Sequence, residues 1–181
     1  MEPQWRAFLV AQGAVIEDGE PVRLPDDGGH DASCDLFDLS HLGLIAVSGP
    51  DALSFLQGQL TNDIRELSPT QSQLSSHCSP KGRMIASFRL LLRDGTILLQ
   101  LPRERVASLL QRLRLFVLRA QVSVQDASDT LVQIGLAGSG APSLLQSLSL
   151  PAPDTDGAVA PSGEISVLRL PAPVPRFELL G

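Results

Sequence analysis

The feature that most constrains the fold is a pair of alternating segments joined by an Asp-Gly dipeptide. In residues 84–93, MIASFRLLLR, an apolar side chain stands at every second position, as expected for a strand with one buried face. Asp94-Gly95 follows, and glycine tolerates the positive φ that a two-residue turn requires. Residues 96–101, TILLQL, supply the partner strand. The sequence therefore predicts an antiparallel hairpin over residues 84–101.

A helix is predicted directly after this hairpin, over residues 103–116. Its apolar side chains fall on one helical stripe: Val106, Leu109, Leu110, Leu113 and Phe116. Arginines occupy its other faces, as expected for a helix that packs one side against the hairpin. Five side chains of the two elements are expected in the core: Met84, Phe88, Leu90, Leu109 and Leu113.

Shorter segments flank this centre. A helix is expected within residues 1–16 and a Gly/Pro/Asp-rich loop over 17–33, which together form an N-terminal region, residues 1–33. Over residues 34–181 we expect, in chain order, a strand at 42–48, a helix beginning at 50, strands at 120–125 and 130–138, a helix at 140–148, a loop at 149–163 and strands at 164–170 and from 176. Antiparallel hairpins that alternate with short helices define an α+β fold. The last strand is expected to have neither a partner strand nor a cap, which suggests a truncated chain or part of a longer protein.

The charge of the chain is unevenly distributed. The formal net charge is −6, which argues against general binding to nucleic acid. Residues 81–119 nevertheless carry +7 and the rest of the chain −13, and Lys81 is the only lysine. An arginine-rich helix face exposed to water explains this segment, and an anion-binding face explains it as well. Both interpretations stay open at the level of the sequence.

Several classes of site and location are disfavoured. The N-terminus lacks the features of a signal peptide and no apolar run approaches the roughly 20 residues that span a bilayer, so a cytoplasmic protein is expected. Cys34 and Cys78 show no CxxC spacing, and we expect reduced thiols and no metal site. No GxSxG, HExxH or P-loop motif occurs, and His30, His41 and His77 define no specific triad, so no catalytic residue is predicted. His77 is expected at a strand end, bonded to nearby backbone.

Three stretches together resemble the N-terminal part of the YgfZ family: DALSFLQGQLTNDIREL (51–67), SSHCSPKGRMIASFRLLLRDG (75–95) and LLQRLRLFVLRAQVSVQDAS (109–128). The YgfZ proteins bind folate and are related to T-protein, the aminomethyltransferase of the glycine cleavage system. The resemblance extends over roughly residues 34–180. It implies the T-protein fold, in which interlocked α+β subdomains and a C-terminal β-barrel surround a folate cavity.

The resemblance also implies a function. A YgfZ-like protein is expected to be bacterial and cytoplasmic, to bind tetrahydrofolate, and to support the maturation or repair of iron–sulfur enzymes, including one that methylthiolates tRNA. Its expected partners are folate and iron–sulfur enzymes or assembly proteins. Neither membrane association nor direct binding of nucleic acid is expected.

Two departures from the family pattern limit what carries over. The Lys-Gly-Cys-Tyr-x-Gly-Gln-Glu signature of the YgfZ family does not occur in residues 1–181, so neither cysteine inherits the role of the signature cysteine. The barrel is missing as well, so the folate cavity is expected to be incomplete, and this chain is expected to bind folate weakly or not at all. T-protein has two acids in the strand that aligns with residues 82–88, where this chain has Ala86 and Ser87. Neither side chain supplies a carboxylate near the folate amine, which argues against aminomethyl transfer.

The candidate folate-binding residues follow from the resemblance. Lys81 and Arg83 open the strand that is expected to line the cavity, where they can meet an anion such as the glutamate tail of folate. Gln100 aligns with a T-protein asparagine, and its amide can donate to and accept from a pterin edge. Asn62 and Asp63 are expected at the pocket rim. Plainer interpretations stay open: Lys81 as a solvated turn residue, and Asn62 and Asp63 as caps of a helix-to-loop corner.

Three functions are therefore compared. The favoured one is a folate-binding accessory protein of iron–sulfur metabolism that is not catalytic by itself. The first alternative is a folate-dependent aminomethyltransferase, against which the loss of both acids argues. The second is a tRNA-binding module that uses residues 81–119. Only 4% of the residues are aromatic and none is tyrosine, so surfaces on which bases stack are scarce.

Overall fold

The hairpin predicted from the alternating segments is present in the computed structural model. It is formed by β6 (Met84–Arg93) and β7 (Thr96–Pro102), and Asp94 and Gly95 of the connecting turn have φ of 48° and 75°. Positive φ at both central residues is typical of a type I′ turn, whose twist matches that of the flanking strands. The Asp-Gly dipeptide therefore sets the register of this hairpin.

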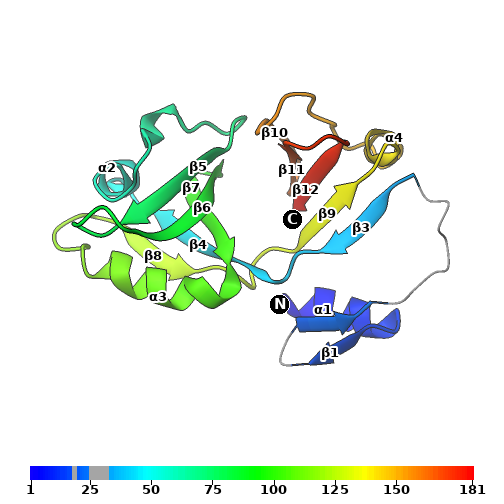
Figure 1. Ribbon diagram of the computed structural model, residues 1–181, viewed down its shortest axis with the longest axis horizontal. Coiled ribbons are helices and arrows are strands. Elements are labelled where there is room, and N and C mark those ends of the chain that lie inside the picture. Colours follow the sequence, from blue (N-terminus) through cyan, green and yellow to red (C-terminus); the bar gives the residue numbers. More distant parts are fainter. Residues whose placement is uncertain (18–19, 25–32) are drawn as a thin grey trace. The chain divides into compact units, whose positions relative to one another are not determined.

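The structure describes residues 1–17, 20–24 and 33–181, which divide into two units (Figure 1). Unit 1 combines Met1–His41 with Asp129–Gly181, and unit 2 is the continuous segment Leu42–Ser128. Each unit is built on a five-stranded antiparallel sheet. Unit 1 thus draws on both the N-terminal region and the remainder of the chain.

The sheet of unit 2 has the strand order β5-β6-β7-β4-β8. Its other strands are β4 (Leu42–Ser48), β5 (Gln73–Cys78) and β8 (Ser123–Asp126). The predicted helix is α3 (Arg103–Arg114), which packs across one face of this sheet (Figure 1). The opposite face of β5, β6, β7 and β4 carries the site described below.

The core of unit 2 lies between α3 and the sheet. Phe88, Leu90, Leu109 and Leu113 are buried there, as predicted. Met84 is 65% exposed, so the prediction that it is buried is wrong. Met84 begins β6 beside the turn from β5, and the pairing of the two strands shifts register there. The apolar alternation therefore continues past the part of the strand that other elements cover.

Two short elements and one unpredicted strand complete unit 2. The helix expected from residue 50 is α2 (Ala52–Gln57), and η1 (Ile64–Glu66) is a single 3-10 turn. Strand β5 was not predicted because its alternation is inverted. Ser75 and His77 are its buried side chains, whereas Leu74 is 62% exposed. A strand that buries polar groups gives no hydrophobic periodicity in the sequence.

The sheet of unit 1 has the strand order β10-β11-β12-β9-β3. Its elements are β3 (Asp35–Asp38), β9 (Gln133–Ala137), α4 (Ala141–Ser147), β10 (Val159–Ser162), β11 (Ile165–Leu170) and β12 (Arg176–Leu180). The short helix α4 packs on the sheet and shares a core with it: Leu136, Ala141, Leu145, Val167 and Phe177.

Two expectations for the C-terminal part are wrong. Strand β12 has partners on both sides, β11 and β9, and both precede it in the chain. Val159–Ser162 is a strand rather than part of a loop, and it forms a hairpin with β11 around Gly163, whose φ is 59°. Pro161 obscures this strand in the sequence. Because β10 is an edge strand, it tolerates a residue that cannot donate to the ladder.

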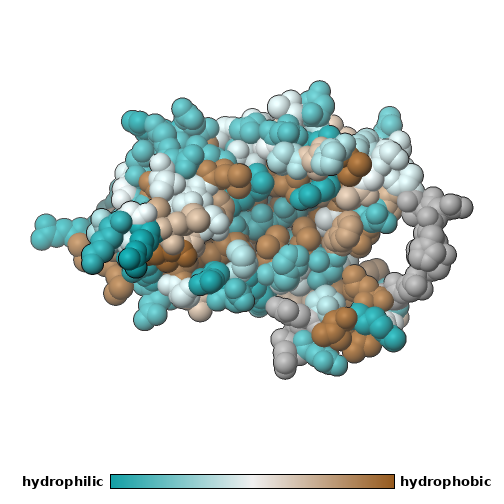
Figure 2. Space-filling model, in the orientation of Figure 1, coloured by the Kyte–Doolittle hydropathy of each residue, from teal (hydrophilic) through white to brown (hydrophobic). Residues whose placement is uncertain are grey.

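The N-terminal region contains more regular structure than expected. The helix predicted within residues 1–16 ends early: α1 covers Pro3–Ala11, and Gly13 with φ of 92° lets the chain turn into β1 (Val15–Glu17). The loop expected over 17–33 contains β2 (Glu20–Arg23), which pairs with β1. Residues 18–19 and 25–32 of this expected loop, with His30 among them, lie outside the described residues. Figure 2 shows apolar side chains gathered over this region, and the exposed ones include Phe8, Val10, Val15 and Val22.

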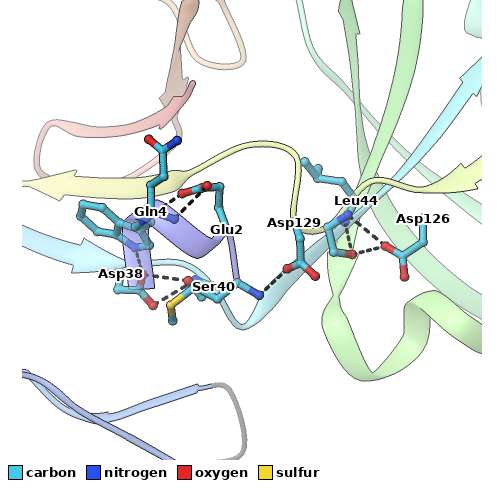
Figure 3. Close-up of polar contacts among 10 residues, drawn as sticks. Glu2, Gln4, Asp38, Ser40, Leu44, Asp126 and Asp129 are labelled. Atoms are coloured by element: carbon cyan, nitrogen blue, oxygen red, sulfur yellow. Dashed lines mark hydrogen bonds and ion pairs between the residues drawn. The ribbon is translucent and has the colours of Figure 1, made fainter. Parts of the chain in front are cut away.

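Helix α1 is attached to β3 by buried and half-buried polar groups (Figure 3). Trp5 donates from Nε1 to Oδ1 of Asp38 over 2.6 Å, and Ser40 donates from Oγ to the same oxygen over 2.9 Å. Glu2 caps the helix by accepting from the backbone N–H groups of Gln4 and Trp5. The α-amino group of Met1 forms an ion pair with Asp129. These bonds therefore hold the first turn of α1 against the rest of unit 1.

The architecture is the predicted α+β fold, with antiparallel sheets and short helices. Among the residues that the structure describes, no set of strands closes into a barrel.

Candidate functional site

The face of the unit 2 sheet opposite α3 carries a concave pocket of about 500 Å³. Phe88 and Leu90 of β6 point toward α3, so strand alternation directs Ser87 and Arg89 to the opposite face. The pocket lies on that face, and the described residues that line it all belong to unit 2: Leu42, Asn62, Leu74, Ser75, Ser76, Ser87, Phe88, Arg89, Gln100, Leu101 and Pro102.

One cross-strand row runs over four strands beneath the pocket. Arg89 of β6 lies opposite Leu74 of β5 and Gln100 of β7, and Gln100 lies opposite Leu44 of β4. Cross-strand neighbours on one face have Cβ atoms about 4.5–5.5 Å apart. A guanidinium and an amide therefore stand side by side with a leucine at each end. Gln100 is only 6% exposed, in a strand whose other central residues are apolar.

Arg89 gives the pocket its charge. The side chain is half-buried, and its Nη1 donates to Oγ of the buried Ser72 over 3.0 Å. Among the described residues that line the pocket, Arg89 is the only charged one and none is Asp or Glu. The pocket therefore presents a positive charge with neutral hydrogen-bonding groups around it, which suits an anionic ligand.

The two positions that align with the T-protein acids lie on different faces. Ser87 lines the pocket, whereas Ala86 packs against the core beneath α3. An acidic side chain at position 87 would therefore point into the pocket. Serine there supplies a hydroxyl that can donate and accept a hydrogen bond, but it holds no negative charge at neutral pH.

The predicted site residues separate into two groups. Gln100 and Asn62 both line the pocket. Lys81, Arg83 and Asp63 do not belong to the described residues that line it. The folate-binding and rim roles of all five remain predictions.

Lys81 and Arg83 lie in the exposed turn between β5 and β6. Ser79 accepts backbone bonds within this turn, from the N–H of Gly82 to its carbonyl over 2.9 Å and from the N–H of Arg83 to its Oγ over 3.1 Å. Gly82 has φ of 74°, a conformation that glycine adopts without strain. Both cationic side chains are thus held at the tip of a hairpin, exposed to water.

Asp63 caps the 3-10 turn η1, as one of the plainer interpretations had it. Its Oδ1 accepts from the backbone N–H of Arg65 over 3.1 Å and from Nε of the same residue over 2.8 Å. Hydrogen bonds from Arg65 lower the pKa of Asp63 from 3.8 to about 2. Asn62, by contrast, is placed at the pocket by its backbone, whose N–H donates to Oγ of Ser75 over 3.4 Å.

His77 lies in β5 and is bonded on both ring nitrogens. Its Nδ1 lies 2.9 Å from the carbonyl oxygen of Gln59, and its Nε2 accepts from Nε of Arg112 over 3.0 Å. The expected bond to nearby backbone is confirmed. The ring is only 3% exposed and sits beside Phe116. It is therefore a structural residue on the α3 side of the sheet.

Comparison with known proteins identifies the family. Residues 30–169 match the GCVT N-terminal domain, which is more than three quarters of the chain. The chain belongs to the GCVT N-terminal domain family.

Within this family the chain is homologous to proteins named tRNA-modifying protein YgfZ. It is 40% identical over 139 residues to the one from Edwardsiella ictaluri, which covers 75% of this chain and 41% of that protein. It is 32% identical over 145 residues to the one from Colwellia psychrerythraea, which covers 80% of this chain and 44% of that protein. The chain thus spans less than half the length of these relatives.

Solved structures show the same fold. The glycine cleavage system aminomethyltransferase T from Bartonella henselae superposes with a TM-score of 0.78 at 22% identity, over 99% of this chain and 53% of that one. A heterotetrameric sarcosine oxidase from a Corynebacterium species gives a TM-score of 0.57 at 15% identity, over 82% of this chain and 75% of that one. Both likenesses support the fold predicted for the GCVT N-terminal domain.

Arg89 is the pocket residue that sequence reasoning missed in this family member. It stands in the middle of MIASFRLLLR, on the face opposite Phe88 and Leu90. The period-two alternation that predicted the strand also predicts that Arg89 shares a face with Ser87. An arginine inside a strand, rather than one at its end, was therefore the signal of a charged pocket.

Three arginines of the basic segment 81–119 form hydrogen bonds within the domain. Arg89 bonds to Ser72 in the pocket, Arg112 to His77 beside the core, and Arg114 to the carbonyl of Val124. These cations hold the strands and α3 together. The segment thus contains structural arginines as well as exposed ones.

Other classes of site find little support in the described part of the chain. Cys34 and Cys78 are free thiols, and partial burial, assisted by Asp35, raises the pKa of Cys34. No group of three or more His, Cys, Asp or Glu residues could hold a metal ion among the described residues. No described helix is long and apolar enough to cross a membrane. Unit 1 has its own, more apolar pocket of about 310 Å³ beside Phe37 and Phe177, and no predicted site residue lines it.

Proposed function

We propose that this chain is a folate-binding member of the YgfZ branch of the GCVT N-terminal domain family. In this proposal it supports tRNA modification, specifically methylthiolation, by assisting the assembly or repair of iron–sulfur enzymes, and it does not catalyse aminomethyl transfer itself. The homology to proteins named tRNA-modifying protein YgfZ supports the tRNA part of the proposal.

The observation that supports the folate part is the pocket on the sheet face opposite α3. Its volume of about 500 Å³ falls within the roughly 300–1,000 Å³ typical of small-molecule sites. Gln100, Ser87 and Arg89 provide hydrogen-bonding groups on its floor, and Leu42 and Leu74 provide apolar surface. This mixture suits a ligand such as tetrahydrofolate, which combines a polar ring system, an apolar aryl group and an anionic tail.

The proposal of a non-catalytic role rests on the pocket's charge. T-protein has acids at the positions of Ala86 and Ser87, and of these only Ser87 lies in the pocket. No carboxylate is present among its described lining residues to hold or accept a proton at the folate amine. The aminomethyltransferase alternative is supported only by a likeness of fold.

The direct test is calorimetric titration of this chain with tetrahydrofolate under anaerobic conditions. We expect saturable binding with a Kd weaker than about 1 µM, because the pocket is a groove on one sheet face rather than an enclosed cavity. Gln100→Ala should weaken binding by about tenfold through loss of an amide hydrogen bond. Gln111→Ala is the matched control, because Gln111 is exposed on α3 and lies outside the pocket.

Absence of saturable binding by the folded wild-type chain would refute the folate proposal. The cellular part needs a separate experiment. In bacteria that lack the gene for this chain, we expect lower levels of methylthiolated nucleosides in tRNA hydrolysates, with restoration by the wild-type gene. Unchanged levels would refute the role in methylthiolation without bearing on folate binding.

A further inference from the structure

The chain leaves α3 through a turn, residues 115–119, at one end of unit 2 (Figure 1). This α3 turn displays large apolar side chains: Leu115 and Leu118 are 70% and 86% exposed, and Phe116 is exposed as well. The turn is nevertheless ordered, because Val117 packs against the core and the backbone N–H groups of residues 115–117 donate to carbonyls of the last turn of α3 over 3.0 to 3.2 Å. Neighbouring apolar side chains that an ordered turn holds in water contribute nothing to the core and mark an interaction surface.

The α3 turn also carries positive charge. Residues 105–125 contain four arginines and no acid. Arg114 and Arg119 flank the apolar side chains, and both are exposed. One carboxylate reaches this segment, that of Asp51, and it accepts from the backbone N–H of Gln121. The turn therefore suits a surface that combines an apolar hollow with a carboxylate.

Helix α1 of unit 1 offers a surface of this kind. Trp5 and Phe8 stack with their ring centroids 5.3 Å apart. Together with Glu2, Gln4 and Val132 they line a hollow of about 390 Å³, called the α1 hollow below. Glu2 is held by N–H groups of the first helical turn, and Trp5 is held by its bond to β3 (Figure 3). The hollow thus has an ordered wall before any partner arrives, which reduces the entropy lost on binding.

The charge of the α1 hollow is negative. Glu2 is the only charged residue among the described residues that line it. Two cations lie nearby. The α-amino group of Met1 is paired with Asp129, and Arg6 lines a separate groove on another face of α1. The α1 hollow and the α3 turn are therefore opposite in charge, and both are apolar.

We infer that the α1 hollow receives the α3 turn of a second copy of this chain. In this contact Leu118 packs beside Trp5 and Phe8, and Arg119 lies against Glu2. Because the two surfaces differ, the contact is heterologous: an associated pair keeps one unused surface of each kind, and association continues into rings or open chains. None of these residues lines the pocket on the unit 2 sheet, so this inference is independent of folate binding.

Other partners match fewer of these features. Binding of single-stranded nucleic acid relies on aromatic stacking, and Phe116 is the only aromatic residue of the α3 turn. A bilayer with anionic head groups suits the leucines and arginines of the turn but leaves the α1 hollow without an occupant.

The test is sedimentation velocity of the whole chain and of four variants. Leu118→Asp disables the α3 turn, and Gln4→Arg places a cation in the α1 hollow, opposite Arg119. Leu148→Asp is the matched control for the first, since Leu148 is an exposed leucine outside both surfaces. Gln12→Arg is the control for the second, because it adds the same charge at the other end of α1. Circular dichroism and thermal unfolding check the fold, and Leu118→Ala replaces Leu118→Asp should the latter fail to fold.

We expect the mean mass of the wild-type chain to rise with concentration over about 1–300 µM, because a small interface gives a weak affinity. Leu118→Asp and Gln4→Arg should each weaken association by at least about tenfold, and the two controls should associate like the wild type. An equimolar mixture of Leu118→Asp and Gln4→Arg should form a heterodimer and nothing larger, because each variant brings one intact surface.

Several results would overturn this inference. One is a wild-type chain that stays monomeric at every concentration, and another is association of either variant as strong as that of the wild type. A mixture of the two variants that forms no heterodimer would exclude a heterologous contact. Cosedimentation of a monomeric chain with vesicles of phosphatidylcholine and phosphatidylglycerol, lost in Leu118→Asp, would assign the α3 turn to a lipid surface instead.

Discussion

Arg112 donates from Nε to Nε2 of His77 over 3.0 Å, although thirty-five residues separate them in the chain. On the other side of the ring, Nδ1 lies 2.9 Å from the carbonyl oxygen of Gln59. Because Nε2 accepts, the hydrogen-bond network assigns the ring proton to Nδ1, which donates to Gln59. One buried imidazole therefore joins α3, β5 and the segment after α2.

The first prediction is that His77→Ala destabilises the chain by about 2–4 kcal/mol, because it leaves the Gln59 carbonyl and the Arg112 N–H without this partner. The measurement is the midpoint of urea unfolding, compared between variants whose unfolding free energy depends equally steeply on urea concentration. His41→Ala is the control: His41 is exposed, so its removal should change the free energy of unfolding by less than about 0.5 kcal/mol. Similar values for the two variants would contradict the structural role of His77.

The second prediction concerns the α3 core. Leu109 and Leu113 are 1% and 0% exposed, and replacing either by alanine should cost about 2–5 kcal/mol through the cavity that remains. Met84→Ala removes a side chain of similar size that is 65% exposed, and it should cost less than about 0.5 kcal/mol. Chemical denaturation of the three variants measures the free energy of unfolding of each. A loss for Met84→Ala as large as for Leu109→Ala would show that Met84 is covered in solution.

Sequence reasoning succeeded where the determinants are local. The β6–β7 hairpin follows from apolar alternation around Asp94-Gly95, and α3 from a stripe that shares one face. It failed where burial depends on distant elements. Met84 continues the alternation of β6 but lies beyond the covered part of the sheet, and β12 looked unpaired because its partners lie earlier in the chain.

The third prediction is that Gly49→Ala is strongly destabilising. Gly49 has φ of 112°, which alanine adopts only with strain, and a Cβ there would lie 2.4 Å from the carbonyl oxygen of Gln121. Gln121 is itself held by Asp51, whose Oδ2 accepts from its N–H over 2.7 Å, so the contact has little room to relax. We expect a loss of at least about 2 kcal/mol in thermal or urea unfolding. Gly95→Ala is a useful comparison, because Gly95 also has positive φ, 75°, but a Cβ there would meet no other atom within 4 Å.

If Gly95→Ala lowers the free energy of unfolding as much as Gly49→Ala does, backbone strain alone explains both effects. A clearly larger loss for Gly49→Ala would show the additional contribution of the close approach to Gln121.

The candidate site was only partly accessible from the sequence, for a similar reason. Gln100 could be proposed because it aligns with a T-protein asparagine, and it does line the pocket. Arg89 was not predicted because the family resemblance draws attention to Lys81 and Arg83 at the start of the strand. A charged residue in the middle of the strand has no such motif around it. Pairing β6 with β7 places Arg89 beside Gln100, and that register is a property of the folded sheet.

The fourth prediction concerns acid stability at the corner formed by Asp63 and Arg65. Because the folded-state pKa of Asp63 is about 2 and its ordinary value is 3.8, the stabilising contribution is present above pH 3.8 and is lost as the pH falls toward 2. Removing the partner with Arg65→Gln should raise the pKa of Asp63 toward 3.8. Carboxyl-detected NMR titration measures it, with Arg83→Gln as a control at an exposed arginine in another turn. An unchanged pKa in Arg65→Gln would contradict the assigned cause.

The fifth prediction is that this chain does not transfer an aminomethyl group to tetrahydrofolate. The reason is the absence of any carboxylate among the described residues of the pocket, with Ser87 at the pocket-facing position where T-protein has an acid. The measurement is formation of methylenetetrahydrofolate from the aminomethylated carrier protein, with the Bartonella henselae aminomethyltransferase as positive control. Ser87→Asp is the matched variant, because it returns a carboxylate to the same face of β6 that carries Arg89. Turnover by the wild-type chain at the rate of the positive control would contradict the proposed non-catalytic role. Turnover by Ser87→Asp alone would instead show that the missing carboxylate is what keeps this pocket from acting as a transferase.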